Sequence, residues 1–268
     1  MNRIRLGAVG YLNARPLVYG LDRSPRFSVR YDVPSRCAAL LHEGAIDVGL
    51  IPSIEYLRGG PYAIVPDLAI ASRGPVASVN LYARKPMAEV KSIAMDASSR
   101  TSAALVRVLC ARRFGIQPAI ETLGPDLAGM LDRCDAALVI GDNALFLDHR
   151  HGLAAHVEKT DLGEAWFELT GLPFVYAFWA GRPGALAAAD VAALQQARDE
   201  GVKRPEELAR EYLAGSPERQ ALGARYLRDN IKYELGDEAL AGLETFYRYA
   251  AEIGVVDKAS APTFYDER

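Results

Sequence analysis

The chain has 268 residues, of which 50% are hydrophobic and 24% are charged, so it can bury a large core as one large or two modest domains. Its formal net charge is −3, and the two signs are interspersed without the basic stripe that a nucleic-acid partner would require. No apolar run is long enough for a signal peptide or a membrane span. We therefore expect a cytoplasmic protein with no nucleic-acid or membrane partner.

The first 57 residues alternate between predicted strands and helices. Apolar runs predict strands at residues 4–9, 27–33 and 47–53. Short helices are predicted to begin near Pro16 and at Pro34, because a proline at a helix start removes no helical hydrogen bond. Strand, helix and strand at this spacing predict a parallel sheet with right-handed crossovers.

The pattern then repeats and gives way to helices. Further strands are predicted at residues 63–72, 76–84, 92–95, 119–123, 136–140 and 173–180, with helices at 103–114, 126–132 and 161–169. Residues 185–254 are predicted to be helical throughout, apart from short turns. We expect two α/β lobes, residues 1–84 plus 175–268 and residues 85–174, joined twice near 82–86 and 172–175, as in hinged proteins that close on a ligand. A single continuous doubly wound sheet is the alternative.

The segment Gly10-Tyr11-Leu12-Asn13 ends the first predicted strand and leads to Pro16. In an open α/β sheet, such a corner opens onto the crevice where ligands bind. The Asn13 amide offers both donors and an acceptor, which suits it to a hydroxyl or a carboxylate. It could equally cap the helix near Pro16.

Polar residues also stand at later corners. Four hydroxyl residues, Ser98, Ser99, Thr101 and Ser102, precede a predicted amphipathic helix, and a helix N-terminus with added hydroxyls favours an anion, although one hydroxyl could be an ordinary cap. Asp142 follows a predicted strand and Gly141, which permits close approach of the backbone. It could orient a substrate hydroxyl or cap the helix after it. Ser78, taken alone, is a polar residue on a strand face.

Several other kinds of chemistry are disfavoured by the sequence. The three cysteines, Cys37, Cys110 and Cys134, are far apart, which indicates reduced, buried thiols. The histidines, including His42, His149 and His151, lack metal-ligand spacing, and there is no GxSxG, Walker or GxGxxG motif. We expect neither a metal nor a cofactor.

Taken in order, the corner motifs resemble those of the MqnA family, the chorismate dehydratases of the futalosine route to menaquinone. The resemblance covers about residues 4–180, and the Ser-Pro-Cys-Pro-Asn motif typical of the neighbouring MqnD family is absent from the sequence. The matching motifs are Gly10-Tyr11-Leu12-Asn13 with Pro16-Leu17, Asp47-Val48-Gly49 with Glu55-Tyr56, Gly74-Pro75-Val76-Ala77-Ser78, Ser99-Arg100-Thr101-Ser102, Ile140-Gly141-Asp142, Asp161-Leu162-Gly163 with Trp166, and Thr170-Gly171-Leu172-Pro173-Phe174-Val175.

The resemblance implies a two-lobed type II periplasmic-binding-protein-like fold with a helical C-terminal portion, used as a hydro-lyase. The reaction would be dehydration of chorismate to 3-[(1-carboxyvinyl)oxy]benzoate, without a cofactor. Asn13 and Ser78 match the residues that the family uses in catalysis. Because they stand at the same corners, we expect the remaining candidates to bind substrate: Tyr11, Ser99, Thr101, Ser102, Gly141 and Asp142.

No histidine or lysine base stands at any of these corners. We therefore hypothesise that the enolpyruvyl carboxylate of the substrate takes the ring proton, held in reach by Asn13. Two other functions compete with this one. The chain could be a non-catalytic cytoplasmic binder of a small carboxylate, or a related menaquinone-pathway enzyme acting on another cyclic carboxylate.

Overall fold

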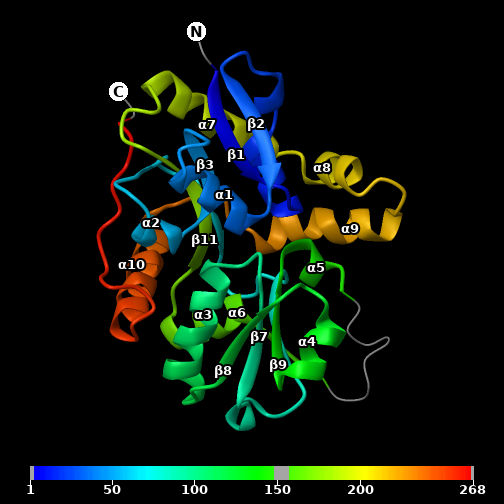
Figure 1. The fold of residues 1–268 in the computed structure, drawn as a ribbon. Coiled ribbons are helices and arrows are strands. Elements are labelled where there is room, and N and C mark those ends of the chain that lie inside the picture. The colour runs from blue at the N-terminus through cyan, green and yellow to red at the C-terminus, as the bar shows by residue number, and fades with distance from the viewer. Residues whose placement is uncertain (1–2, 148–156, 267–268) are drawn as a thin grey trace.

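The computed structural model describes residues 3–147 and 157–266, which form two β-sheets, one above the other in Figure 1. The first sheet has the strand order β2 (Phe27–Asp32), β1 (Ile4–Val9), β3 (Val48–Pro52), β11 (Phe174–Gly181) and β4 (Ala63–Ile64), and β5 (Ile70–Ser72) also pairs with β11. The second has the order β10 (Glu158–Asp161), β6 (Val79–Ala83), β9 (Ala136–Ile140), β7 (Ser92–Asp96) and β8 (Ala119–Leu123). The alternative of one continuous sheet is therefore wrong.

Both sheets are mixed, whereas the strand–helix spacing predicted a parallel one. The β1 strand is parallel to β2 and β3, and β7 is parallel to β8 and β9. The exceptions are β11, which runs antiparallel to all its neighbours, and β6, which runs antiparallel to β9 and β10. These two strands belong to the segments by which the chain passes between the sheets.

The first passage between the sheets lies earlier in the chain than residues 82–86. It occurs between β5 and β6, after Ser72 and before Val79, so the strand at residues 79–83 belongs to the second sheet. The chain returns between α6 (Leu162–Thr170) and β11. Ser72 pairs with Phe174, so the chain leaves and re-enters the first sheet at neighbouring positions.

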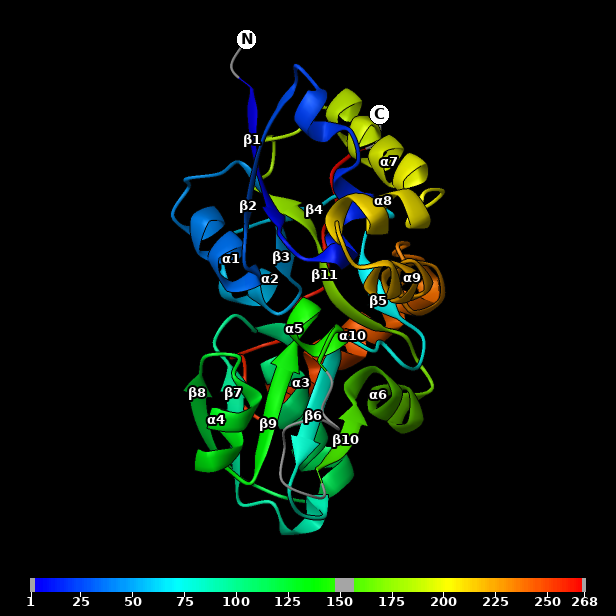
Figure 2. The same ribbon diagram turned by 90° about the vertical axis from the view of Figure 1, so that its right-hand side faces the viewer.

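Helices cover both faces of the first sheet (Figure 2). α1 (Pro34–His42) and α2 (Glu55–Arg58) lie on one face, and α7 (Ala188–Gly201), α8 (Pro205–Tyr212) and α9 (Pro217–Arg225) lie on the other. Prolines open α1, α8 and α9, as expected of a residue without an N–H group. Two short 3₁₀ segments, η1 (Leu12–Val18) and η2 (Leu21–Arg23), follow β1, and a third, η3 (Met87–Glu89), lies between β6 and β7 of the second sheet.

The second sheet carries α3 (Thr101–Leu109), which continues as η4 (Cys110–Phe114), together with α4 (Leu127–Arg133), α5 (Gly141–Leu145) and α6. The last helix, α10 (Asp237–Glu252), packs where the chain returns to the first sheet. There Phe246 of α10, Trp166 of α6 and Phe174 of β11 make edge-to-face contacts with ring centroids 4.9–6.1 Å apart. This aromatic cluster fixes the C-terminal helix against both sheets.

Candidate functional site

A cavity lies between the two sheets, and about 530 Å³ of the space in it and at its open mouth, solvent included, is free of protein atoms. It is bordered by the carboxyl ends of parallel strands from both sheets, which is where α/β folds place their ligands. Seven of the eight predicted site residues line it: Tyr11, Asn13, Ser78, Ser99, Thr101, Ser102 and Gly141. Among the described lining residues, Arg100 is the one charged side chain, so the cavity suits an anionic ligand.

Asn13 lies inside η1 and does not cap it. The N-cap position is Tyr11, and no side chain makes a capping hydrogen bond there. The Asn13 Oδ1 atom is buried without a hydrogen-bond partner, although its residue lines the cavity. A buried acceptor without a partner is costly, and a ligand donor would remove that cost. Of the two interpretations of Asn13, the helix cap is wrong, and ligand contact stays a prediction.

Ser78 lies directly before β6 and is fully buried. Its Oγ atom is 2.7 Å from the hydroxyl oxygen of Tyr226, which begins η5 (Tyr226–Asn230), a π-helical turn following α9. The sequence did not single out Tyr226, because an aromatic residue on a helix face is normally a core residue. Here its ring is buried, but its hydroxyl reaches a candidate catalytic residue.

The turn that presents Ser78 is held by a single carboxylate. Ala77 has a φ of +65°, which is unusual for a residue with a side chain. Asp161 accepts hydrogen bonds from the amides of Val76 and Ala77, and it also caps α6 by accepting from Gly163 and Glu164. Asp161 therefore fixes the turn before Ser78 and the start of α6 together.

The amino end of α3 forms the opposite wall. None of the hydroxyls caps this helix: its N-cap residue is Arg100, without a side-chain cap. The first helical bond runs from the Ala104 amide to the Arg100 carbonyl, so the amides before Ala104 make no helical bond. The Ser99 Oγ atom is buried without a partner, whereas the Thr101 Oγ1 atom accepts from the Ile54 amide at 3.2 Å. This end of α3 has the features of an anion site.

Tyr11 and Gly141 fit together across the two sheets. Gly141 has a φ of +62°, and a Cβ atom built on it would lie only 2.5 Å from the Tyr11 ring. The close approach that Gly141 was expected to permit is therefore that of a tyrosine ring. The Tyr11 hydroxyl lies 3.2 Å from the Oγ atom of Ser98, which itself donates to Asp96, so Ser98 supports the wall without lining it.

Asp142 is the predicted site residue that does not line the cavity. Its carboxylate accepts from the Leu12 amide at 3.1 Å and from the Tyr212 hydroxyl, and it makes no capping bond to α5. The helix cap expected of Asp142 is therefore absent, and its carboxylate does not line the cavity in which the substrate contact was expected. Instead, Asp142 joins α5 of the second sheet to η1 and α8 on the first.

Comparison with known proteins places the chain in a family. The family model described as menaquinone biosynthesis matches residues 4–252. A chorismate dehydratase of Thermus thermophilus is 33% identical over 280 residues, which is 98% of each chain. The chain belongs to the menaquinone biosynthesis family. The resemblance to the MqnA family that the corner motifs indicated is thereby confirmed.

Solved structures of low sequence identity share the fold of this chain, binding proteins among them. A protein of Archaeoglobus fulgidus matches with a TM-score of 0.75 at 16% identity, covering 95% of this chain and 98% of that one. The alkanesulfonate-binding protein of Xanthomonas axonopodis pv. citri, solved bound to MOPS, matches with a TM-score of 0.68 at 17% identity over 97% and 96%. The periplasmic aliphatic sulphonate binding protein of Escherichia coli gives 0.60 at 18% over 97% and 96%. They confirm the periplasmic-binding-protein-like α/β fold.

Other expectations can be compared with the described part of the chain. Its three cysteines are free and buried, and burial raises the pKa of Cys37 and of Cys110 to about 12. Within residues 3–147 and 157–266, no three His, Cys, Asp or Glu side chains gather as a metal site would require. His149 and His151 lie outside these residues. No helix found there has both the length and the apolar character to span a bilayer.

Proposed function

We propose that this protein is a hydro-lyase that removes water from chorismate to give 3-[(1-carboxyvinyl)oxy]benzoate. The observation that carries the proposal is the cavity itself, in which Asn13 and Ser78 face the amino end of α3 and Arg100 is the one charged lining residue among those described. The relative named as a chorismate dehydratase, which matches along nearly the whole chain, supports the same reaction.

The two carboxylates of chorismate fit different parts of the cavity. The unpaired amides and the Ser99 hydroxyl at the start of α3, with Arg100 beside them, would hold the ring carboxylate. Hydrogen bonds there stabilise the negative charge that moves onto this group when the ring loses its proton. Asn13, on the opposite wall, would hold the enolpyruvyl side and the ring hydroxyl, since its amide can donate and accept.

No carboxylate, histidine or lysine is among the described residues that line the cavity. We propose that the enolpyruvyl carboxylate of the substrate takes the ring proton. The electron pair of the C–H bond enters the ring, the adjacent C–O bond breaks, and the departing hydroxide combines with the transferred proton as water. The ring becomes aromatic, and no redox partner is needed.

The sheets with their helices would act as lobes that close over this reaction and exclude water. The structure has several contacts between them, such as the Ile54 amide on Thr101 and the Ser35 amide on the Ser98 carbonyl at 3.1 Å. We also propose a cytoplasmic location for the protein.

The test is incubation of the purified protein with chorismate alone, followed by ultraviolet absorbance and mass of the product. We expect an aromatic product lighter by one water. Binding without conversion would instead support a non-catalytic carboxylate binder, and conversion of another cyclic carboxylate only would support a related enzyme.

Asn13→Ala should lower turnover much more than thermal stability, and an unchanged rate would exclude its role. An analogue lacking the enolpyruvyl carboxylate should bind without turnover.

A further inference from the structure

Tyr226 connects the two candidate catalytic side chains from outside the cavity. Its side chain is 2% exposed, and it is not among the residues that line the cavity. Its hydroxyl oxygen lies 2.7 Å from Ser78 Oγ, and the neighbouring Asn13 side chain lowers the pKa of the phenol, as a donor to its oxygen does. One phenol therefore contacts residues from the Asn13 corner and from the turn before β6.

The direction of these hydrogen bonds follows from the groups involved. Burial raises the pKa of Tyr226 above its ordinary value, so the phenol is neutral near pH 7 and has one hydrogen to donate. The Asn13 Oδ1 atom has no partner, so Asn13 contacts the phenol through its NH₂ group, which can only donate. The phenol oxygen accepts from Asn13, and its hydrogen goes to Ser78 Oγ. The hydroxyl hydrogen of Ser78 is then left for the cavity.

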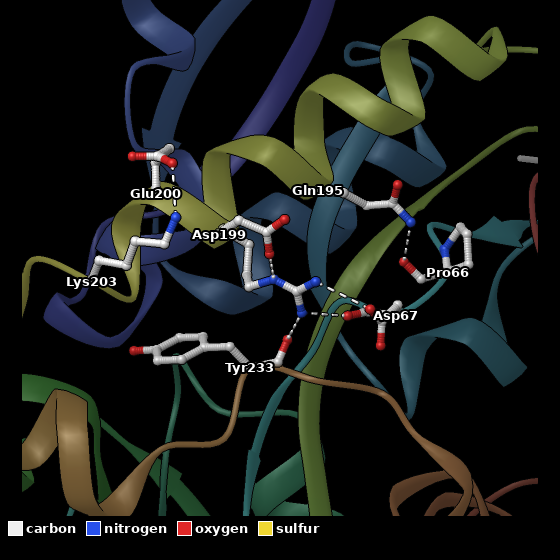
Figure 3. Close-up of polar contacts among 8 residues, drawn as sticks. Pro66, Asp67, Gln195, Asp199, Glu200, Lys203 and Tyr233 are labelled. Atoms are coloured by element: carbon white, nitrogen blue, oxygen red, sulfur yellow. Dashed lines mark hydrogen bonds and ion pairs between the residues drawn. The ribbon is translucent and has the colours of Figure 1, made fainter.

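The segment that carries Tyr226 is tied to both corners by further contacts. The Tyr233 hydroxyl donates to the Asn13 carbonyl at 3.0 Å, and the Asn230 side chain donates to the Pro75 carbonyl at 3.0 Å. The Tyr233 carbonyl in turn accepts from the buried Arg198, whose other partners include Asp67 and Asp199 (Figure 3). These contacts of Asn230 and Tyr233 hold the segment that follows Tyr226 against the Asn13 corner and the turn before Ser78.

We propose that Tyr226 is a positioning residue for the elimination, which orients Ser78 to donate a hydrogen bond to the departing ring hydroxyl while it leaves Asn13 Oδ1 open to the substrate. This inference rests on the proposed dehydration of chorismate. Ser78 donates a hydrogen bond and transfers no proton, so the balance of the reaction is unchanged. Without Tyr226, the Ser78 hydroxyl can rotate away, and a donor that is needed mainly in the transition state is lost.

The experiment compares Tyr226→Phe, Ser78→Ala and the double variant with the parent protein, by steady-state turnover of chorismate. Tyr226→Phe keeps the ring, so the core stays filled. Tyr265→Phe is the matched control, because Tyr265 is also buried but its hydroxyl donates to the Arg182 carbonyl, away from the cavity. Thermal unfolding of each variant shows how much folded protein is assayed.

We expect Tyr226→Phe to lower kcat by about 100-fold, with KM changed by less than about 3-fold. Tyr265→Phe should keep the parent's kcat. Because Tyr226 acts through Ser78, adding Tyr226→Phe to Ser78→Ala should lower kcat little further. Additive losses, or a Tyr226→Phe kcat equal to the parent's, would overturn the inference and leave the proposed function intact. If the parent itself converts no chorismate, the proposed function fails, and this role of Tyr226 fails with it.

Discussion

The Asp161 carboxylate accepts a 2.7 Å hydrogen bond from the amide of Ala77, a residue held at a φ of +65°. A left-handed backbone at alanine costs about 1–2 kcal/mol and persists only where surrounding contacts enforce it. The next residue is Ser78, so the strained turn and the carboxylate together set where this hydroxyl stands. The Asp161-Leu162-Gly163 motif, which the sequence showed as one corner among several, therefore serves to hold the turn that positions Ser78.

Replacing Asp161 by asparagine should loosen this turn. The NH₂ group of asparagine cannot accept, so amides that now share the two carboxylate oxygens lose a partner. We expect the free energy of unfolding to fall by about 1.5–3 kcal/mol and kcat to fall at least about 10-fold. Chemical denaturation and steady-state kinetics measure the two effects. Asp126→Asn is the control, because Asp126 is also an N-cap residue but makes no side-chain capping bond. Equal behaviour of the two variants would exclude the role assigned to Asp161.

Gly141→Ala should disturb the cavity wall as well as the backbone. The added methyl group would lie 2.5 Å from the Tyr11 ring at a φ of +62°. Gly171→Ala provides the control, since Gly171 has a φ of +71° but open space around its Cβ position. We expect the control to lose about 1–2 kcal/mol of stability and Gly141→Ala to lose about 1–3 kcal/mol more, with weaker substrate binding. Unfolding curves and KM report these losses, and equal losses would show that Tyr11 adapts freely.

Asp142→Asn should change how stability depends on pH. Burial raises the pKa of Asp142, an effect that the contacts from Tyr212 and Leu12 and the charge of Arg15 only partly offset. A carboxyl whose pKa is raised by folding stabilises the protein fully below its unfolded pKa, and this contribution is lost as pH rises through the folded pKa. Asparagine stays neutral throughout this range. The stability of Asp142→Asn relative to the parent should therefore improve as pH rises from about 4 towards 7.

The physical reason for this pH effect is the burial of the Asp142 carboxyl, which disfavours its charged form more than the contacts from Tyr212 and Leu12 favour it. The Tyr212 hydroxyl is within hydrogen-bonding distance of both the Gly10 carbonyl and Asp142, so it has one hydrogen for two acceptors. Denaturation at several pH values measures the effect, with the exposed Asp257→Asn as control. A relative stability of Asp142→Asn that falls as pH rises would contradict this account.

Arg198→Met should destabilise the C-terminal part of the fold. Arg198 is 7% exposed, and its guanidinium donates to the carbonyl of Tyr233 and to both the carbonyl and the carboxylate of Asp67 (Figure 3). The carboxylates of Asp67 and Asp199 are half-exposed, so the main cost is the loss of the donor to the Tyr233 and Asp67 carbonyls, about 1–3 kcal/mol each. An exposed ion pair is worth at most about 1 kcal/mol. Arg228→Met, which removes the exposed ion pair to Glu206, is the control. Similar midpoints in urea for the two variants would show that the Arg198 contacts add little.

The sequence predicted most elements and most of the cavity wall because both depend on local patterns. Hydrophobic runs and helix-opening prolines located β1, β7, β9 and the C-terminal helices, and strand-end corners gave seven lining residues. The predicted strand at residues 63–72 is instead two short strands, β4 and β5, because the left-handed Asp67 at a φ of +61° and Pro66 lie between them.

What the sequence could not predict depends on contacts between distant segments. The antiparallel direction of β11 depends on the point at which the chain re-enters the first sheet after α6, and no local sequence pattern indicates that point. Tyr226 and Tyr212 meet Ser78 and Asp142 across 148 and 70 residues, so their hydroxyls could not be told from those of ordinary core tyrosines. Asp142 was expected in the cavity because it stands at a strand-end corner, but its carboxylate instead accepts hydrogen bonds from the Tyr212 hydroxyl and the Leu12 amide.

The pairing of Ser72 with Phe174 also has a consequence for how the chain folds. The first sheet needs β11 between β3 and β4, and β11 arrives only after residues 73–173 have been placed. The strands of the second sheet all come from residues 79–161, so they close shorter loops. The second sheet should therefore gain protection from hydrogen exchange before β3 and β11 do in a pulse-labelled refolding experiment. The wall of the cavity that the second sheet forms would then be present before β11 joins the first sheet and completes the other wall.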